Sequence, residues 1–288
     1  MSQALTLPSE WLNRPIRILL LGAGGTGGEV LHGLVRIHTM LNELDHPGGL
    51  DLTLMDGDTF SRWNIGRQRC YPTDTGCNKA SVLIQRINIA YGLAWRGIQS
   101  NWSPGGLTNS HTDLSRYDLL ISCVDRASVR IEIAKAGKTL YDPILWMDCG
   151  NGQYTGQCVL GHLGRKQRVG ELRLPHVFDL YPELSQVDDD SEPSCSSQQA
   201  LRSQDLFTNS LLANAALTLL WRLLRTGRLD SHGVLIDTQK PMVTALPIDP
   251  KVWEFYRARP ARPPKRRKSP ESRRRRPLLA APATRVQP

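Results

Sequence analysis

The chain has 288 residues and 40% of them are hydrophobic, which is enough for one large α/β domain with a substantial core. No apolar run approaches the roughly 20 residues that a membrane-spanning helix needs, and the first residues lack the basic and apolar regions of a secretory signal. The six cysteines are scattered and form no CxxC pair, as expected of free thiols in a cytoplasmic protein.

The formal net charge of +9 is unevenly distributed along the chain. Residues 257–288 hold twelve of the 36 Lys and Arg residues and one of the 27 acids, so this tail carries +11 and residues 1–256 carry −2. The tail is rich in Pro and Arg and poor in large apolar side chains, which predicts disorder. Its runs PKRRK and SRRRR suit contact with nucleic-acid phosphates, and a merely solubilising tail is the alternative.

The first predicted strand, Ile16–Leu21, is a nearly continuous apolar run, as in a strand buried on both faces. Gly22, Gly24 and Gly27 follow it as GxGxxG. In a dinucleotide-type fold the first glycine permits a tight turn, the second lets a phosphate approach, and the third lets helix pack on strand. A tight turn without a ligand is the alternative. The apolar positions that follow have helical spacing: Val30, Leu31, Leu34, Ile37 and Leu41.

The second predicted strand, Leu50–Met55, ends at Asp56. An acid at this place could accept hydrogen bonds from ribose hydroxyls. An aspartate that only closes a turn is the alternative.

Polar and cationic residues follow this acid in a way that a typical NAD site does not require: Asp58, Asn64, Arg67, Gln68 and Lys79. Their spacing suits a triphosphate, because Arg67 and Lys79 could neutralise charge on the β- and γ-phosphates as pyrophosphate leaves. Both side chains are therefore expected to face solvent or ligand, and solvated surface charges are the alternative for each taken singly.

The remaining elements alternate in type and complete a Rossmann-like α/β fold, with a mainly parallel sheet and helices on both faces. One helix begins near Lys79 and buries Ala80, Leu83, Ile87 and Ala90. The next elements are a strand at 117–124, a helix at 127–137, strands at 144–151 and 155–163, a polar crossover loop at 165–204, a long helix with Leu206, Leu212, Ala215, Leu219 and Leu223 that stops at Gly227, and a hairpin at 233–249.

Five motifs resemble, in their order, those of the ThiF/MoeB/HesA family, the adenylating core of ubiquitin-activating (E1) enzymes. They are GAGGTGG at 22–28, DGDTFSRWNIGRQ at 56–68, GCNK at 76–79, VDRASVR at 124–130 and GQYTGQCV at 152–159. The resemblance covers about Arg17 to Gly227. More narrowly, the chain resembles the ThiF-related member of plasmid cassettes that also encode a ParB-related protein.

The resemblance implies a nucleotide site for ATP and Mg²⁺, a homodimer, and a small ubiquitin-like or sulfur-carrier protein as partner. Asp125 matches the family's magnesium-associated aspartate, for which a helix cap is the alternative, and Arg130 matches the arginine that follows it. Cys195 lies in the crossover loop at the offset from the next helix where a family cysteine often receives the carrier. An incidental exposed thiol is the alternative, and Cys77, close to Arg67 and Lys79, is the best rival for this role. The family's paired CxxC motifs are missing, so no structural zinc is expected.

The leading hypothesis is therefore ATP-dependent adenylation of the carrier's C-terminal carboxylate, with possible transfer to a cysteine. The basic tail motivates a second hypothesis, a non-catalytic DNA-associated factor that retains a nucleotide-binding fold. An NAD-dependent reductase comes third, because no substrate domain or hydride-transfer acid is visible in the sequence.

Overall fold

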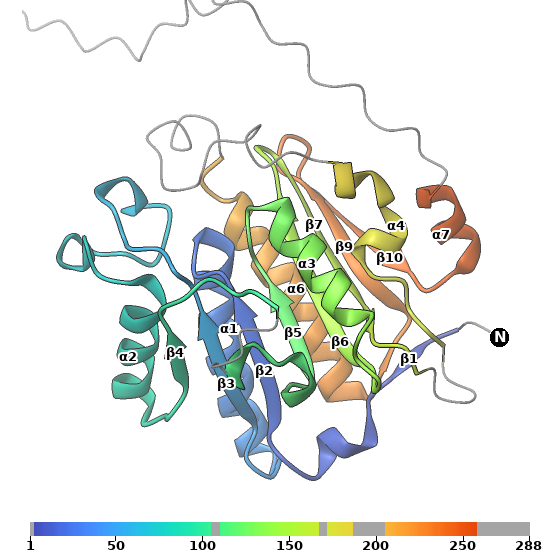
Figure 1. The fold of residues 1–288 in the computed structure, drawn as a ribbon, viewed down its shortest axis with the longest axis horizontal. Coiled ribbons are helices and arrows are strands. Elements are labelled where there is room, and N and C mark those ends of the chain that lie inside the picture. The colour runs from blue at the N-terminus through green and yellow to red at the C-terminus, as the bar shows by residue number, and fades with distance from the viewer. Residues whose placement is uncertain (1–2, 105–109, 167–171, 187–204, 258–288) are drawn as a thin grey trace, which may run out of the picture. The chain divides into compact units, whose positions relative to one another are not determined.

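The computed structural model describes residues 3–104, 110–166, 172–186 and 205–257 (Figure 1). Cys195 and residues 258–288 of the basic tail lie outside these ranges, so their predicted roles stay predictions.

The main sheet has eight strands within the described residues, in the order β10–β9–β7–β6–β5–β2–β3–β4. The strands from β4 to β6 run parallel, and those from β6 to β10 run antiparallel. The fold class is thus confirmed, with an antiparallel extension. The bounds are β2 Ile16–Leu21, β3 Leu50–Met55, β4 Arg96–Ile98, β5 Leu119–Ser122, β6 Ile144–Asn151, β7 Thr155–Leu163, β9 Ser231–Asp237 and β10 Met242–Pro247. β1 (Leu5–Thr6) and β8 (Arg228–Leu229) form a separate antiparallel pair.

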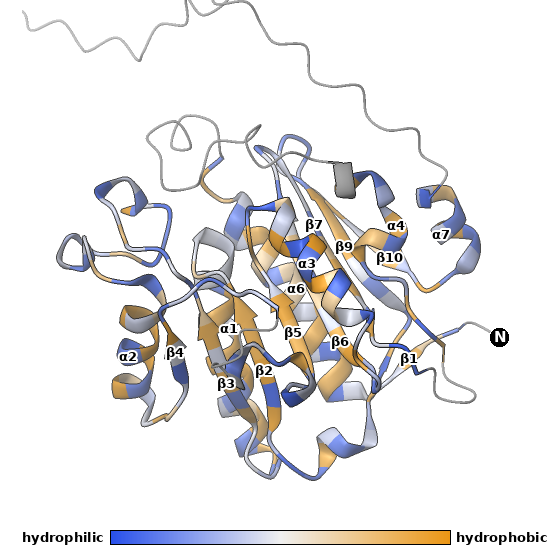
Figure 2. Ribbon diagram, viewed as in Figure 1, coloured by the Kyte–Doolittle hydropathy of each residue, from blue (hydrophilic) through white to orange (hydrophobic). Residues whose placement is uncertain are grey.

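Helices cover both faces of the sheet. In Figure 1, α1 (Gly25–Glu43) and α6 (Thr208–Thr226) lie together behind it, and α3 (Ala127–Gly137) lies in front. α2 (Lys79–Tyr91) packs against β3 and β4. The central strands are hydrophobic along their length (Figure 2), which follows from their burial on both faces. No helix in the described part of the chain could cross a membrane.

Short elements complete the described part of the chain. They are α4 (Val177–Leu180), α7 (Pro250–Arg257), and 3-10 helices at Ser9–Leu12, Arg62–Asn64, Pro72–Asp74, Ser110–Thr112, Leu114–Arg116 and Pro182–Gln186. α6 ends at Gly227 in the left-handed conformation, as predicted.

Three sequence predictions are wrong in detail. α2 buries Ile84, whereas Ala90 is exposed. The strand expected at 117–124 is shorter at both ends. Leu206 precedes α6 and is 53% exposed.

The region predicted as a polar crossover loop contains ordered, buried structure. Leu174, Val177 and Leu180 are each at most 1% exposed, and the last two belong to α4. The sequence pattern does not reveal this segment, because Pro175, His176 and Asp179 interrupt its apolar residues.

α7, which the sequence did not predict, is attached to the sheet through His232. This imidazole is fully buried, its Nδ1 lies 2.9 Å from the Leu160 carbonyl oxygen, and its Nε2 accepts a hydrogen bond from Trp253 Nε1 at 2.8 Å. The ring is therefore neutral, with its proton on Nδ1. Burial lowers the pKa of His232 to about 4.

Acidification is expected to destabilise the fold through His232. Between pH 6.5 and 4 the His232 ring is protonated in the unfolded chain but not in the folded chain. The free energy of unfolding therefore decreases as the pH is lowered through this range. The loss at pH 5 should be about 2 kcal/mol relative to pH 7.5. Urea denaturation of wild type and His232→Gln at both pH values measures it, and an unchanged pH dependence in the variant would contradict this.

Candidate active site

The predicted nucleotide residues gather at the carboxyl edge of the parallel strands. After β2 the chain continues to β3 and β4 on one side, and it returns through β5 on the other side of β2. The loops after β2 and β5 therefore diverge at this point, and open α/β sheets bind ligands in the crevice so formed. The glycine loop follows β2, Asp56 follows β3 and Asp125 follows β5.

The three glycines of the GxGxxG motif have different structural roles. Gly22 has a φ of +89°, and a Cβ there would lie 2.7 Å from the carbonyl oxygen of Cys123. A Cβ on Gly27 would collide with the Gly22 carbonyl oxygen. A Cβ on Gly24 would meet no described atom within 4 Å. Gly22 and Gly27 thus make the loop possible, while Gly24 presents open backbone at the α1 N-terminus, where anions are favoured.

Asp56 connects the end of β3 to the glycine loop. Its Oδ2 accepts the Ala23 N–H at 2.6 Å, and its Oδ1 accepts the Asp58 N–H at 2.7 Å. Burial raises the pKa of Asp56, and the two N–H donors together with Lys79 only partly oppose that rise.

Lys79 is 3% exposed, so it does not face solvent, and of the two predicted surroundings only the ligand remains. Its Nζ donates to Asp58 Oδ2 at 3.0 Å, and its backbone N–H donates to the Asp58 carbonyl at 3.0 Å. Asn78 caps α2 by accepting the Ser81 N–H, and its amide donates to the Asp56 and Asp58 carbonyls. The loop after β3 is therefore held over the start of α2, and this covers the lysine stem.

Asn64 and Gln68 leave buried amide atoms without a hydrogen-bond partner in the described chain. Asn64 is 0% exposed, and its Oδ1 accepts the Ser61 N–H at 2.8 Å, but its Nδ2 is unsatisfied. Neither Oε1 nor Nε2 of Gln68, which is 8% exposed, is bonded. Unmade bonds of this kind cost about 1–3 kcal/mol each, so they indicate a place for a polar ligand.

The same segment borders the glycine loop. Arg67 is half-buried, and its carbonyl oxygen lies 3.4 Å from the Cβ position of Gly25. Arg69 pairs with Glu29 of α1 at 2.8 Å. The structure therefore brings the Asn-x-x-Arg-Gln segment against the N-terminus of α1.

Asp125 is exposed to solvent, whereas Arg130 is largely buried. Asp125 is exposed in the loop after β5, one residue before Arg126, which occupies the N-cap of α3 without a side-chain capping bond. Arg130 is largely buried, and its Nε donates to Asp148 Oδ1 at 2.8 Å. The described residues contain no cluster of three metal-ligand side chains. Mg²⁺ needs only one or two carboxylates when phosphates and waters supply the rest, so an exposed Asp125 fits it.

Two networks of polar side chains lie behind the site, and neither was predicted from the sequence. Ser122 Oγ donates to Asp148 Oδ1 at 2.5 Å and accepts from Trp146 Nε1 at 2.8 Å. Asn209 Oδ1 of α6 accepts from Thr26 at 3.1 Å and from Asn151 at 2.9 Å. An aspartate inside the apolar run ILWMDCGN was the available signal for the first network, whereas nothing in the sequence pattern indicates the second.

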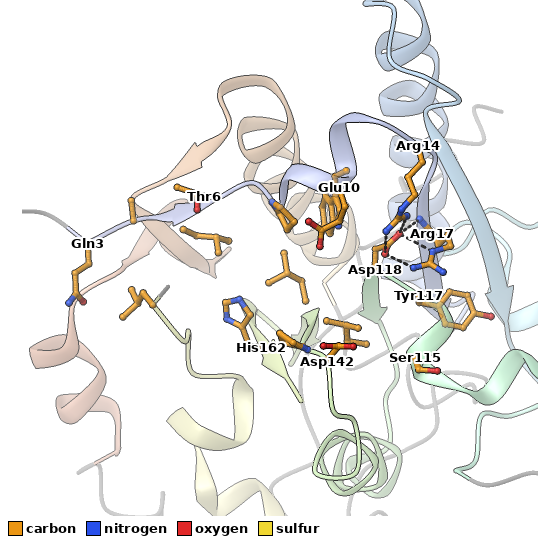
Figure 3. A pocket seen from close by; sticks show the side chains of 18 residues that line it. Gln3, Thr6, Glu10, Arg14, Arg17, Ser115, Tyr117, Asp118, Asp142 and His162 are labelled. Atoms are coloured by element: carbon orange, nitrogen blue, oxygen red, sulfur yellow. Dashed lines mark hydrogen bonds and ion pairs between the residues drawn. The ribbon is translucent and has the colours of Figure 1, made fainter. Parts of the chain in front are cut away.

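A cavity of about 810 Å³ lies at the opposite, amino edge of the sheet, away from these residues (Figure 3). The Asp118 carboxylate, which lines this cavity, forms salt bridges with the guanidinium groups of Arg14 at 2.6 Å and Arg17 at 2.8 Å. Burial alone would raise the pKa of Asp118, but the hydrogen bonds from the two arginines outweigh burial and lower the pKa to about 2.

Asp118→Asn should lower the free energy of unfolding by about 2 kcal/mol at pH 7, because it leaves two guanidinium groups without their carboxylate. The stabilisation by Asp118 is fully present above pH 3.8 and is lost as the pH falls through about 2. The difference in free energy of unfolding between wild type and variant should therefore shrink between these two pH values. Urea denaturation measures it. Asp142→Asn, which alters an exposed carboxylate lining the same cavity, is the control and should change little.

Comparisons with known proteins agree with this fold. The family model described as "ThiF family" matches residues 11–251. A search of curated proteins finds no significant match. Among solved structures, PaaA is similar with a TM-score of 0.55 and 15% identity over 81% of this chain and 64% of PaaA. MccB from E. coli is similar with a TM-score of 0.52 and 15% identity over 83% of this chain and 63% of MccB.

A crystal structure of MccB with ATP is also similar, at a TM-score of 0.50 and 15% identity over 83% of this chain and 65% of MccB. Others contain MccB with AMPCPP and MccA. The chain spans less than two thirds of the length of these proteins, and identities this low show the fold alone. The family model covers most of the sequence, and so the chain belongs to the ThiF family.

Proposed function

We propose that the chain catalyses ATP-dependent adenylation of a carboxylate on a small protein or peptide. The observation that carries this proposal is the set of buried, unsatisfied amide atoms of Asn64 and Gln68, next to an open glycine loop at the switch point of the sheet. In a ThiF-family chain, a nucleotide at that point is the ligand that would satisfy them.

In the proposed complex the phosphates lie along the glycine loop of Gly22, Gly24 and Gly27, and the ribose lies near Asp56. The other nucleotide contacts come from Asp58, Asn64, Arg67, Gln68, Lys79, Asp125 and Arg130. Mg²⁺ held near Asp125 would supply charge neutralisation at the phosphates.

The reaction joins two anions, so charge neutralisation and positioning supply most of the catalysis. A carboxylate oxygen attacks the α-phosphorus, the bond from that phosphorus to the oxygen bridging to the β-phosphate breaks, and pyrophosphate leaves. Arg67 stabilises the charge that develops on the leaving group. Lys79, buried and paired with Asp58, contributes its charge from beneath the loop and holds the loop in place.

The finer substrate assignment is the C-terminal carboxylate of a ubiquitin-like or sulfur-carrier protein. The crystal structures of MccB with MccA support a small partner chain for a protein of this fold. Transfer to a thiol at Cys195, assembly as a homodimer, and membership of the ParB-related plasmid cassette belong to the same proposal.

ATP–pyrophosphate exchange tests the proposed function. The purified chain is mixed with ATP, Mg²⁺, labelled pyrophosphate and each short protein encoded beside its gene. Label should enter ATP only with a carrier whose C-terminus is free, and not with the same carrier amidated at that end. Equal exchange with both forms, or with none of the carriers, would contradict adenylation.

DNA association through the tail is the second candidate, favoured by the contrast between +11 in residues 257–288 and −2 in residues 1–256. A chain truncated after Tyr256 should exchange pyrophosphate normally and lose any DNA binding in a gel-shift series across salt. DNA retention equal to that of the full chain would refute this role of the tail.

A further inference from the structure

A second cavity, of about 380 Å³, lies where α3 ends and β7 leaves the sheet. Its lining comes from the last turn of α3 with Lys138, from the end of β7 with Arg165, and from the segment between Arg173 and His176. None of the candidate active-site residues in the described part of the chain lines it.

The ionisable side chains that line this cavity within the described chain are all basic: Lys138, Arg165, Arg173 and His176. Lys138 and Arg165 are exposed, whereas Arg173 and His176 are half-buried. A concave surface with charge of one sign concentrates counter-ions. The C-terminus of α3 opposes an anion through its partial negative charge, and Lys138, at the C-cap position, offsets it.

Arg173 is held in place before any ligand arrives. Its Nη1 donates to the Gly164 carbonyl at 2.7 Å, and its Nη2 donates to the His162 carbonyl at 3.4 Å. Neutral carbonyls fix the guanidinium but do not neutralise it, so its positive charge remains at the cavity wall.

His176 adds an unsatisfied polar atom. Its Nδ1 is buried without a hydrogen-bond partner in the described chain, and its Nε2 lies 3.6 Å from Asp179 Oδ2. The ring also packs on Trp146, with centroids 5.4 Å apart. Burial lowers the pKa of His176, Asp179 opposes this, and Arg173 and Lys138 lower it further. A negative ligand in the cavity would favour protonation of the ring.

We propose that this cavity binds the phosphate group of a small metabolite or of inorganic phosphate. Two arginines and a lysine match a dianion better than a monocarboxylate, and guanidinium groups bind phosphate oxygens with strong, charge-assisted hydrogen bonds. The volume suits a small ligand.

The His176 ring is the probe for the experiment, because phosphate could also enter the nucleotide site and global measurements would mix the two sites. Full-length protein with ¹⁵N-labelled histidine is titrated with inorganic phosphate and, separately, with glycerol phosphate, while chloride keeps the ionic strength constant. The His176 resonance is assigned by its loss in His176→Gln. We expect phosphate to raise the measured pKa of this ring. Tighter binding of inorganic phosphate would identify the free ion as the ligand, and tighter binding of glycerol phosphate would identify a phosphorylated metabolite.

Two double variants that each remove two positive charges distinguish binding in this cavity from a general electrostatic attraction to the basic surface. Lys138→Gln with Arg165→Gln should weaken phosphate binding by roughly tenfold or more. Lys135→Gln with Lys166→Gln removes the same charge from neighbouring positions that do not line the cavity and should bind as wild type does. Single Arg165→Gln, at an exposed position, serves if the double variant does not fold. No response of His176 to either ligand, or equal weakening in both double variants, would overturn the proposal.

Discussion

Arg67→Ala is expected to lower carrier-dependent ATP–pyrophosphate exchange by about 10²-fold, as when one preorganised charge-stabilising group is removed. Arg67 lies in the segment packed against the N-terminus of α1, where the phosphates are proposed to bind. Its side chain is only half-buried, so the variant should keep the denaturation midpoint of wild type.

Arg62→Ala is the matched control, because Arg62 lies two residues before this segment, is exposed, and lies over the Trp63 ring at 4.0 Å. It should exchange normally. Equal activity of the two variants would remove Arg67 from the mechanism.

Lys79→Ala should reduce exchange to a similar degree. The burial of Lys79 adds a loss of stability that Arg67→Ala does not share, since the Asp58 pair is broken at a covered position.

Gly27→Ala is expected to have the largest effect on stability, about 3 kcal/mol or more, because its Cβ would occupy the place of the Gly22 carbonyl oxygen. Either α1 moves away from the loop or the loop deforms, and ATP binding is lost with it.

Gly24→Ala should weaken ATP binding without changing the stability of the fold. Its φ of −74° is accessible to alanine, and its Cβ meets no described atom within 4 Å, so the fold should tolerate it. The added methyl group stands where a phosphate would approach, and ATP affinity should fall about tenfold or more while the thermal midpoint changes little. Calorimetric titration with ATP and thermal denaturation measure both quantities. An unaffected ATP affinity in Gly24→Ala would place the phosphates elsewhere.

Local patterns predicted much of the fold because strong signals bounded several of the central elements. The apolar runs of β2 and β3 end at turn residues, and the bounds of α3, β6 and β7 match the structure to the residue. The switch point at the carboxyl edge then follows from topology, since the order of parallel strands places the glycine loop beside the loop that carries Asp125.

The misses depend on contacts between segments distant in sequence. Lys79 is covered because the loop after β3 folds over α2. α7 is held by Trp253 on His232, a pair that has no periodic signal. The unsatisfied amides of Asn64 and Gln68 are likewise visible only once burial is known.

A crystal structure of the full chain with Mg²⁺ and a non-hydrolysable ATP analogue tests the central claim most directly. We expect phosphates on the open backbone at Gly24, a hydrogen bond from the amide of Asn64 or Gln68 to the nucleotide, and the terminal phosphates within reach of Arg67. A nucleotide bound in the cavity beside Asp118, or one at the carboxyl edge that leaves both amides unsatisfied, would contradict it.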